Sequence, residues 1–286
     1  MEIRRATPEM FEGIHGVLRE FGGSLTRDDW RRLVDYRFSD QSYRGWVSVE
    51  NDQIVGFLGG IFSRRGDARF CSLTSWITKR EYRKANLQIL VPMLKLEDHT
   101  LLNYSASPFT AKLFRERLGF QVLDEHLVVI PAVTPRLSPR GWKQLKRPHE
   151  LESVLVGEER RIWRDHLPYP ARHVVLAGPR GRHLYVVATA TRLKRMKVSH
   201  LHYISDPDLF VELVNHVQRA LLFGMHTVVT TVDSRLLAGR RIRGALGWKL
   251  AQPRLFRPGN PRPTGTIDSL YTELVLLNPA RWTFNH

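Results

Sequence analysis

The chain carries the same pair of landmarks twice, offset by nearly half its length. His99-Thr100 precedes Leu118-Gly119-Phe120, with 20 residues from His99 to Gly119; His226-Thr227 precedes Leu246-Gly247-Trp248, with 21 residues from His226 to Gly247. In both places a strand pattern opens at His-Thr and a helix pattern closes at Leu-Gly, where glycine can serve as a C-cap. The repeat indicates duplication. Because 286 residues accommodate two ordinary domains, we expect two copies of one α/β fold.

The first half alternates strand and helix patterns. Apolar alternation and helical spacing predict strands over 43–50, 53–62, 69–78, 99–104 and 120–130, and helices over 8–21, 26–38, 84–96 and 111–118. Thr7 and Thr26 are the expected N-caps, and Gly119 is the expected end of the last helix.

The second half follows a similar order after a proline-rich segment. We expect strands over 183–194, 197–205, 226–232 and 267–277, and helices over 208–223 and 238–246. Residues 131–148 contain four prolines and five basic residues, a composition typical of a linker. The predicted division is a first domain over 1–132, a linker over 133–148 and a second domain over 149–286.

Charge is distributed unevenly between the halves. The formal net charge is +16; residues 1–140 hold 21 Lys and Arg against 17 Asp and Glu, and the remainder holds 23 against 11. Such an excess fits either an anionic partner or an arginine-rich solvated surface. A single cysteine excludes an internal disulfide and a cysteine-rich zinc site. Short apolar runs and a start without a secretory signal lead us to expect a soluble, cytoplasmic protein without membrane contact.

One segment of the first half resembles a known family. Ser105–Phe120, SASPFTAKLFRERLGF, is similar to the late strand–helix–strand of the GNAT superfamily of N-acyltransferases, and the likeness extends through the 46–62 hairpin to Ile3–Glu9. It covers roughly residues 1–130, and the second half resembles the same superfamily more faintly. The implied fold class is α/β (α+β), with two tandem GNAT-like domains, each a mixed, mostly antiparallel sheet flanked by helices. The implied activity is direct transfer of an acyl group from acetyl-CoA or another acyl-CoA, as cosubstrate, to an amine within a ternary complex.

The resemblance also implies a CoA-binding loop between the third strand and its helix. In the family, backbone N–H groups at a helix start face the CoA pyrophosphate, and glycines permit close approach. Arg83 matches the family motif, Asn86 and Gln88 stand where glycines are usual, and Arg80 and Lys84 add positive charge. The residues implied to bind the cosubstrate are Trp76, Ile77, Thr78, Arg83, Lys84, Ala85, Asn86, Leu87, Gln88 and Phe114.

The catalytic groups are harder to assign. Phe114 stands where many family members have a tyrosine that protonates the leaving thiolate, and phenylalanine cannot donate a proton. Tyr104 and Ser107 are the candidate replacements, and the backbone of 76–78 is the implied donor to the thioester oxygen. No general base can be assigned. The ionisable residues considered for that role are Glu50, Asp67, Asp124, His15, His99 and His126.

The second copy lacks the CoA loop. Asp206-Pro207-Asp208 leads directly into a helix, and its carboxylates would repel phosphate, so we interpret this half as a copy that does not bind CoA. It would complete the substrate groove or pack as a pseudo-dimer, in a monomer or a homodimer. The basic clusters Arg192–Lys197 and Arg240–Arg243 are candidates for attracting an acidic acceptor. His200 and His202 share a strand face without a third ligand, so no metal site is expected.

A different class of function stays open. The chain could be a non-catalytic, GNAT-derived binding module whose basic second half docks nucleic acid or another anionic partner. Gln88, Asn86 and Phe114 favour that hypothesis, whereas Arg83 and the Ser107–Phe120 segment favour an enzyme acting on a small-molecule or peptide amine. These residues do not determine the acceptor or the length of the acyl chain.

Overall fold

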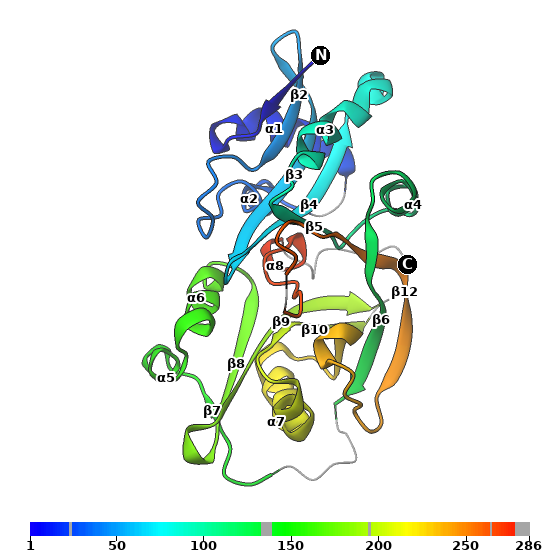
Figure 1. Cartoon of the computed structure of the whole chain (residues 1–286). Helices are drawn as coiled ribbons and strands as arrows, with labels where there is room; N and C mark the ends of the chain where they lie inside the picture. The colour runs from blue at the N-terminus through cyan, green and yellow to red at the C-terminus, as the bar shows by residue number, and fades with distance from the viewer. Residues whose placement is uncertain (23–24, 133–138, 194–195, 264, 278–286) are drawn as a thin grey trace. The chain divides into compact units, whose positions relative to one another are not determined.

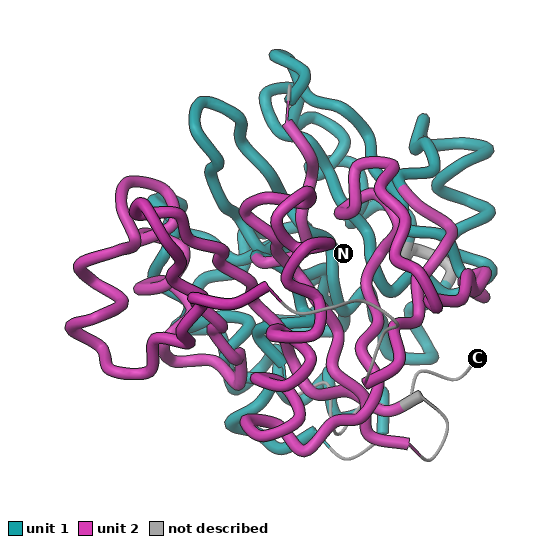
Figure 2. Tube along the Cα trace, turned by 90° about the horizontal axis from the view of Figure 1, so that it is seen from below, with its two compact units in different colours: residues 1–123, 252–264, 271–278 teal, residues 124–251, 265–270, 279–286 magenta. Residues whose placement is uncertain are grey.

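The computed structural model describes residues 1–22, 25–132, 139–193, 196–263 and 265–277, with only the backbone for 84–86 and 193 (Figure 1). The chain forms two compact units, coloured separately in Figure 2. Unit 1 comprises Met1–Leu123, Gln252–Thr264 and Tyr271–Asn278, and unit 2 comprises Asp124–Ala251, Gly265–Leu270 and Pro279–His286.

Unit 1 is built on a sheet with the strand order β1-β2-β3-β4-β5. All neighbouring strands are antiparallel except β4 and β5, which are parallel. The elements are β1 (Glu2–Arg5), η1 (Pro8–Met10), α1 (Phe11–Leu18), η2 (Arg19–Phe21), α2 (Arg27–Arg31), β2 (Gly45–Glu50), β3 (Gln53–Arg65), β4 (Ala68–Thr78), η3 (Arg80–Ile89), α3 (Leu90–Leu94), β5 (His99–Asn103) and α4 (Pro108–Arg117).

Local sequence explains several of these boundaries. Thr26 caps α2 through a reciprocal pair of hydrogen bonds with Asp29, which confirms that N-cap. Ser107 Oγ accepts a hydrogen bond from Thr110 N at the start of α4, and Gly119 takes a φ of +72° just after its end, as expected for a C-cap glycine. Thr7 occupies the N-cap position of η1 with an extended backbone, as predicted, but makes no side-chain cap bond.

The core of unit 1 lies where α3 and α4 cover one face of the sheet. Cys71 and Leu73 of β4 and Leu101 of β5 point into it. The buried members are Tyr43, Trp46, Leu58, Phe62, Cys71, Leu73, Ile89, Leu90, Met93, Leu101, Ala106, Ala111, Phe114, Phe120 and Leu255. Because strand side chains alternate, Ser72 points to the opposite face.

Unit 2 repeats this strand order as β7-β8-β9-β10-β11, again with only the last pair parallel. The elements from β6 onward are β6 (Gln121–Pro131), β7 (Lys143–Leu145), α5 (Pro148–Val154), α6 (Gly157–His166), β8 (Ala171–Ala177), η4 (Pro179–Gly181), β9 (His183–Leu193), β10 (Met196–Ile204), α7 (Pro207–Met225), β11 (Val229–Asp233), η5 (Ser234–Leu237) and β12 (Leu246–Arg257). Of these, β6 begins and β12 ends in residues of unit 1.

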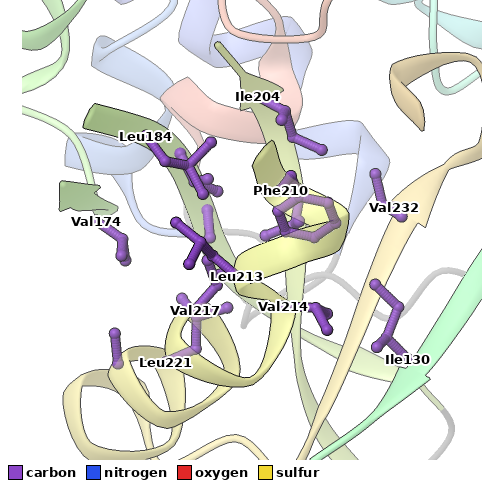
Figure 3. Packing of buried hydrophobic residues seen from close by; sticks show 14 of the residues in the cluster. Ile130, Val174, Leu184, Ile204, Phe210, Leu213, Val214, Val217, Leu221 and Val232 are labelled. Carbon is purple, nitrogen blue, oxygen red and sulfur yellow. The ribbon is translucent and has the colours of Figure 1, made fainter. Parts of the chain in front are cut away.

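A long amphipathic helix organises the core of unit 2. Leu213, Val217 and Leu221 follow one another at four-residue spacing on α7 and face Val174 of β8 and Leu184 of β9 (Figure 3). These side chains are buried, so α7 closes this face of the sheet.

The two halves of the chain exchange their last strand. Residues 255–257 of β12 pair antiparallel with β5 in unit 1, and residues 127–131 of β6 pair antiparallel with β11 in unit 2. The short helix α8 (Glu273–Leu276) also belongs to unit 1. The compact units therefore do not follow the predicted division at residues 132 and 149, and β7 lies inside the segment predicted as a linker.

Several predicted elements differ in the structure. The helix predicted over 26–38 is α-helical only as far as Arg31, and the strand predicted from His226 begins at Val229 because His226 is the left-handed C-cap of α7. The helix over 238–246 is absent, because Ala238, Gly239 and Gly244 all have positive φ, and β12 begins at Leu246 instead. The Leu246-Gly247 landmark thus opens a strand and does not close a helix. The strand over 267–277 is replaced in part by α8, and the helix over 84–96 is 3₁₀ up to Ile89, with α3 only from Leu90.

Candidate functional site

The paired part of β4 and β5 ends midway along β4. Their parallel ladder runs from Arg69 opposite His99 to Ser72 opposite Leu102. Beyond it β4 continues to Thr78, paired on its other side with β3 as far as Gly56. One edge of the β4 backbone after Ser72 is therefore outside the described β5 ladder, so it can hydrogen-bond to a ligand.

A β-bulge interrupts β4 in this same stretch. Ser75 and Trp76 together oppose the single residue Leu58, and Ser75 has a φ of +54°, which is uncommon for a residue other than glycine. Bulges re-aim side chains and backbone groups, and the Trp76 ring lies 6.1 Å from that of Phe114 on α4. The residues predicted to contact the thioester oxygen, Trp76, Ile77 and Thr78, directly follow this distortion.

One buried polar atom without a partner lies where the two strands part. Asn103 Oδ1 makes no hydrogen bond within the described residues, whereas Ser72 Oγ is a hydrogen-bonding neighbour of the Glu273 carboxylate, although the two form no bond of ordinary geometry. Asn103 lies two residues beyond Leu101 and so faces the α3/α4 side, whereas Ser72 faces the other side. Because buried polar groups are nearly always satisfied, Asn103 Oδ1 marks a place for a polar ligand or water.

Glu273 is the carboxylate that the sequence patterns did not reveal. It is 1% exposed, and its Oε1 accepts a 2.6 Å hydrogen bond from Oγ of the exposed Ser105. Burial raises the pKa of Glu273, although the Ser105 bond, the Arg254 charge and the Ser72 hydroxyl act in the opposite direction. The available signal was one acidic residue inside the apolar run YTELVLL, which the predicted strand over 267–277 obscured.

The predicted CoA loop contributes positive charge but no regular α-helix start. Arg80 and Arg83 have exposed side chains at the beginning of η3, and Leu87 and Gln88 are also exposed. The side chains of Lys84, Ala85 and Asn86 lie outside the described residues. Because η3 is a 3₁₀ segment, any pyrophosphate site here would depend on the guanidinium groups more than on a helix dipole.

The two predicted catalytic candidates have structural neighbours. Ser107 Oγ caps α4 and also lies 2.9 Å from Thr110 Oγ1. Tyr104 is 1% exposed, and the Arg254 guanidinium lies 5.7 Å from its ring centre. Phe114 is buried against Phe120, with ring centres 4.7 Å apart.

The unassigned ionisable residues are dispersed over the two units. Asp124 is not a surface residue: it is buried in unit 2, where it accepts hydrogen bonds from Ser234 Oγ and Arg235 N, each 2.8 Å long. The others have local neighbours: Glu50 with the Met1 amine, Asp67 with Arg64, His15 with Phe11, His99 with Asp98 and, through its backbone N–H, His126 with Asp124. None of these residues is placed beside Glu273 by a contact the structure describes.

The equivalent place in unit 2 is filled by the chain itself. The β10–β11 ladder ends at Leu201 opposite Val232, and a bulge follows at His202. Ser269 donates its backbone N–H to His202 O at 3.3 Å, and Ser269 Oγ lies 2.9 Å from His202 Nδ1. Arg235 Nε also donates to Ile267 O, so residues 265–270 occupy the position where β10 and β11 part.

Both acidic side chains at the start of α7, Asp206 and Asp208, make contacts within unit 2. Asp206 caps the helix by accepting from Leu209 N at 2.9 Å. Asp208 forms a bidentate pair with Arg240, with distances of 2.8 and 2.7 Å, and the guanidinium lowers the pKa of Asp208. The Arg240–Arg243 cluster is therefore partly neutralised, while part of the Arg192–Lys197 cluster lies outside the described residues.

The histidine pair and the cysteine serve packing. His200 Nδ1 lies 3.0 Å from Thr231 Oγ1, and His202 Nε2 lies 2.8 Å from Thr189 Oγ1. Cys71 is buried, and burial raises the pKa of its thiol.

In the part of the chain that is described, no group of three or more His, Cys, Asp or Glu side chains could hold a metal ion. Nor is any of its helices long and apolar enough to cross a bilayer.

Comparison with known proteins gives likeness in structure alone. No protein-family model matches the chain, and no curated protein matches its sequence. A tandem GNAT protein from the clavulanic acid biosynthesis pathway is similar over 89% of this chain and 96% of its own, with a TM-score of 0.55 and 11% identity. A GCN5-related N-acetyltransferase from Anabaena variabilis matches 89% of this chain and 71% of its own, with a TM-score of 0.53 and 13% identity.

A third similar structure contains a bound acyl-CoA. The N-myristoyltransferase of Saccharomyces cerevisiae with bound myristoyl-CoA matches 97% of this chain and 88% of its own, with a TM-score of 0.50 and 10% identity. The chain thus has the tandem GNAT fold, as its sequence resemblance implied, in an α/β architecture with mixed, mostly antiparallel sheets.

Proposed function

We propose that this chain, whose two units share the tandem GNAT fold, is an acyl-CoA-dependent N-acyltransferase with its active site in unit 1. The observation that carries the proposal is the parting of β4 and β5 after Ser72, beside the Ser75–Trp76 bulge. There one edge of the β4 backbone lies outside the described β5 ladder, and the buried Asn103 Oδ1 has no hydrogen-bond partner among the described residues. Several solved proteins of this fold are N-acyltransferases, which is consistent with that use.

The residues present suit an acyl-CoA as cosubstrate. Arg80 and Arg83 offer guanidinium groups to the pyrophosphate at the end of β4. Asn103 Oδ1 can accept a hydrogen bond from an amide N–H of the pantetheine arm, and the β4 backbone at Trp76–Thr78 can donate to the thioester oxygen. We propose that the predicted set Trp76, Ile77, Thr78, Arg83, Lys84, Ala85, Asn86, Leu87, Gln88 and Phe114 lines this path.

Unit 2 would then play no part in binding CoA. Residues 265–270 occupy its corresponding position, and Asp206 and Asp208 stand at the start of α7, where phosphate would be repelled. The acceptor we propose is a small-molecule or peptide amine, and the acyl group is acetyl or longer.

Calorimetric titration tests the cosubstrate. The wild-type chain should bind acetyl-CoA, with CoA and longer acyl-CoAs compared alongside. Arg83→Glu should abolish binding, because it places a carboxylate beside the pyrophosphate. Arg4→Glu on β1, at the other edge of the unit 1 sheet, makes the same change of charge and should leave binding unchanged. Absence of wild-type binding to every acyl-CoA tested would overturn the proposal.

The binding-module alternative has a separate observation behind it, the net positive charge of the second half. It predicts association with DNA or RNA whose affinity falls steeply with salt. A titration with a mixed-sequence duplex and a single-stranded RNA, at low and physiological salt, distinguishes the two functions. Salt-sensitive nucleic-acid binding without acyl-CoA binding would favour the module.

A further inference from the structure

Glu273 is a buried carboxylate of unit 1 that lies on α8, later in the sequence than every described strand. Tyr271, two residues before Glu273, packs edge-on against Phe38 at 4.8 Å, and the Arg65 guanidinium lies 5.9 Å from its ring centre. Phe38 follows α2, so these contacts place the segment away from the α3/α4 core, whose buried members include neither Tyr271 nor Phe38.

The Glu273 carboxylate lies near the point where β4 and β5 part. Its Oε1 accepts from Ser105, which follows β5, and its electrostatic neighbours include Ser72, the last β4 residue in the ladder with β5. It therefore lies close to the start of the β4 segment to which we assign the thioester. The α3/α4 face would receive the CoA arm, which leaves the Ser72 face for the amine.

Ser105 and Glu273 differ in exposure in a way that suits a proton relay. Ser105 is exposed, whereas Glu273 is buried, with one carboxylate oxygen bonded to Ser105 and the Ser72 hydroxyl as a further polar neighbour. An exposed hydroxyl can contact a bound amine, and the carboxylate behind it can accept the proton that the hydroxyl passes on.

We propose that Ser105 and Glu273 remove the proton from the ammonium group of the acceptor. This inference rests on the proposed acyltransferase function and names the group that the sequence patterns could not assign. Ser105 Oγ takes one proton from the ammonium while its own proton passes to the Glu273 carboxylate. The neutral amine nitrogen then bonds to the thioester carbon, the C–S bond breaks with its electron pair on sulfur, and the second nitrogen proton goes to that sulfur. The products are the amide, CoA thiol and a protonated Glu273.

The charged neighbour that acts on this carboxyl is Arg254 of β12, whose guanidinium also donates to Tyr104 O. Arg254 favours the ionised carboxylate, while burial disfavours it more strongly. Glu273 is therefore a proton acceptor with a raised pKa. Its pKa is closer to that of an amine than the pKa of an exposed carboxylate is.

The test measures thiol release from acetyl-CoA against pH, with the most active amine from a panel of a polyamine, an aminoglycoside and a lysine peptide. Glu273→Gln and Ser105→Ala should each lower kcat by about 100-fold or more and flatten the acidic limb of the pH profile, as expected for loss of a general base. Ser105→Thr keeps the hydroxyl and should restore most of the rate. Ser153→Ala on α5, which removes an exposed hydroxyl bonded to Glu150 O, is the matched control.

Each outcome decides between the two proposals. If the wild type shows no amine-dependent thiol release, both fall. If the wild type is active and both variants keep its rate and its acidic limb, the relay is wrong and the acyltransferase stands. If Glu273→Gln fails to fold, the rate and pH profile of Ser105→Ala alone test the relay. Calorimetry with acetyl-CoA checks that a slow variant still binds the cosubstrate.

Discussion

Ser105 Oγ and Glu273 Oε1 lie 2.6 Å apart although the two residues are separated by 168 positions in the chain. The bond holds α8 at the end of β5, beside which β12 also pairs. Unit 1 is thus completed by residues that come after all of the strands of unit 2. Its described residues come from one N-terminal segment, 1–123, and from two later segments that begin at Gln252 and Tyr271.

A fragment of residues 1–132 should therefore not fold stably. Without β12, the β5 edge loses its antiparallel partner, and without α8 the apolar residues that α8 covers become exposed to water. We expect the fragment to aggregate or to show broad, non-cooperative thermal unfolding by circular dichroism, with the full chain unfolding cooperatively beside it. A soluble fragment with a sharp transition would contradict this.

Glu273→Gln should change how stability depends on pH. Because burial raises the pKa of Glu273 in the folded state above its unfolded value, the folded chain binds more protons, and stability falls as pH rises from about 4.5 through the folded pKa. Gln cannot ionise, so the unfolding free energy of the variant relative to wild type should increase with pH. Urea titrations between pH 4.5 and 8 measure this difference. A difference that does not vary with pH would show that the carboxyl titrates normally.

Phe114 should act as a core residue. It is 1% exposed and packs on Phe120 and Trp76, so Phe114→Ala should lower the unfolding free energy by about 3–5 kcal/mol. Phe109 on the same helix is 72% exposed, and Phe109→Ala should change it by no more than about 0.5 kcal/mol. Equal effects of the two substitutions in chemical denaturation would refute the assigned packing.

Two glycines should respond to alanine with opposite sign. Gly45 has a φ of +120°, and a Cβ there would lie 2.1 Å from Leu58 O, so Gly45→Ala should be destabilising by several times RT, on the order of 2–3 kcal/mol or more. Gly16 lies in α1, and an alanine methyl there would meet nothing within 4 Å, so Gly16→Ala should stabilise by about 0.5–1 kcal/mol. Melting temperatures of the two variants, compared with wild type, check both signs at once.

Titration with acetyl-CoA should give one site per chain. Residues 265–270 fill the place in unit 2 that corresponds to the parting of β4 and β5, as the contacts of Ser269 with His202 show. Calorimetry should return a stoichiometry near one, and Arg83→Glu should remove all of the heat. A stoichiometry near two, or a residual site in that variant, would mean that unit 2 also binds.

Much of the fold was accessible from local patterns. The hairpin of β2 and β3, the Thr26 cap and the helix predicted over 111–118 with its Gly119 C-cap depend on residues a few positions apart, so periodicity and capping predicted them, although α4 begins earlier, at Pro108. The helix predicted over 238–246 is absent because Ala238, Gly239 and Gly244 have positive φ, which the spacing of apolar residues does not reveal. The predicted CoA loop is still a prediction, since the side chains of Lys84, Ala85 and Asn86 are not described.

The local sequence indicated two copies and, through the resemblance of the first half to the GNAT superfamily, the order of its elements, because neighbouring residues encode strands and helices. The second-half landmarks themselves were misread, since His226 caps a helix and Leu246 opens a strand. Three-dimensional packing alone established which segments complete each unit, that residues 265–270 fill the parting of β10 and β11, and that Glu273 meets Ser105. The exchanged strands and the Glu273 contact join residues more than 100 positions apart, on which no local spacing acts. The excess positive charge fits either an anionic partner or an arginine-rich solvated surface, and in unit 2 one of its basic residues, Arg240, is paired with Asp208.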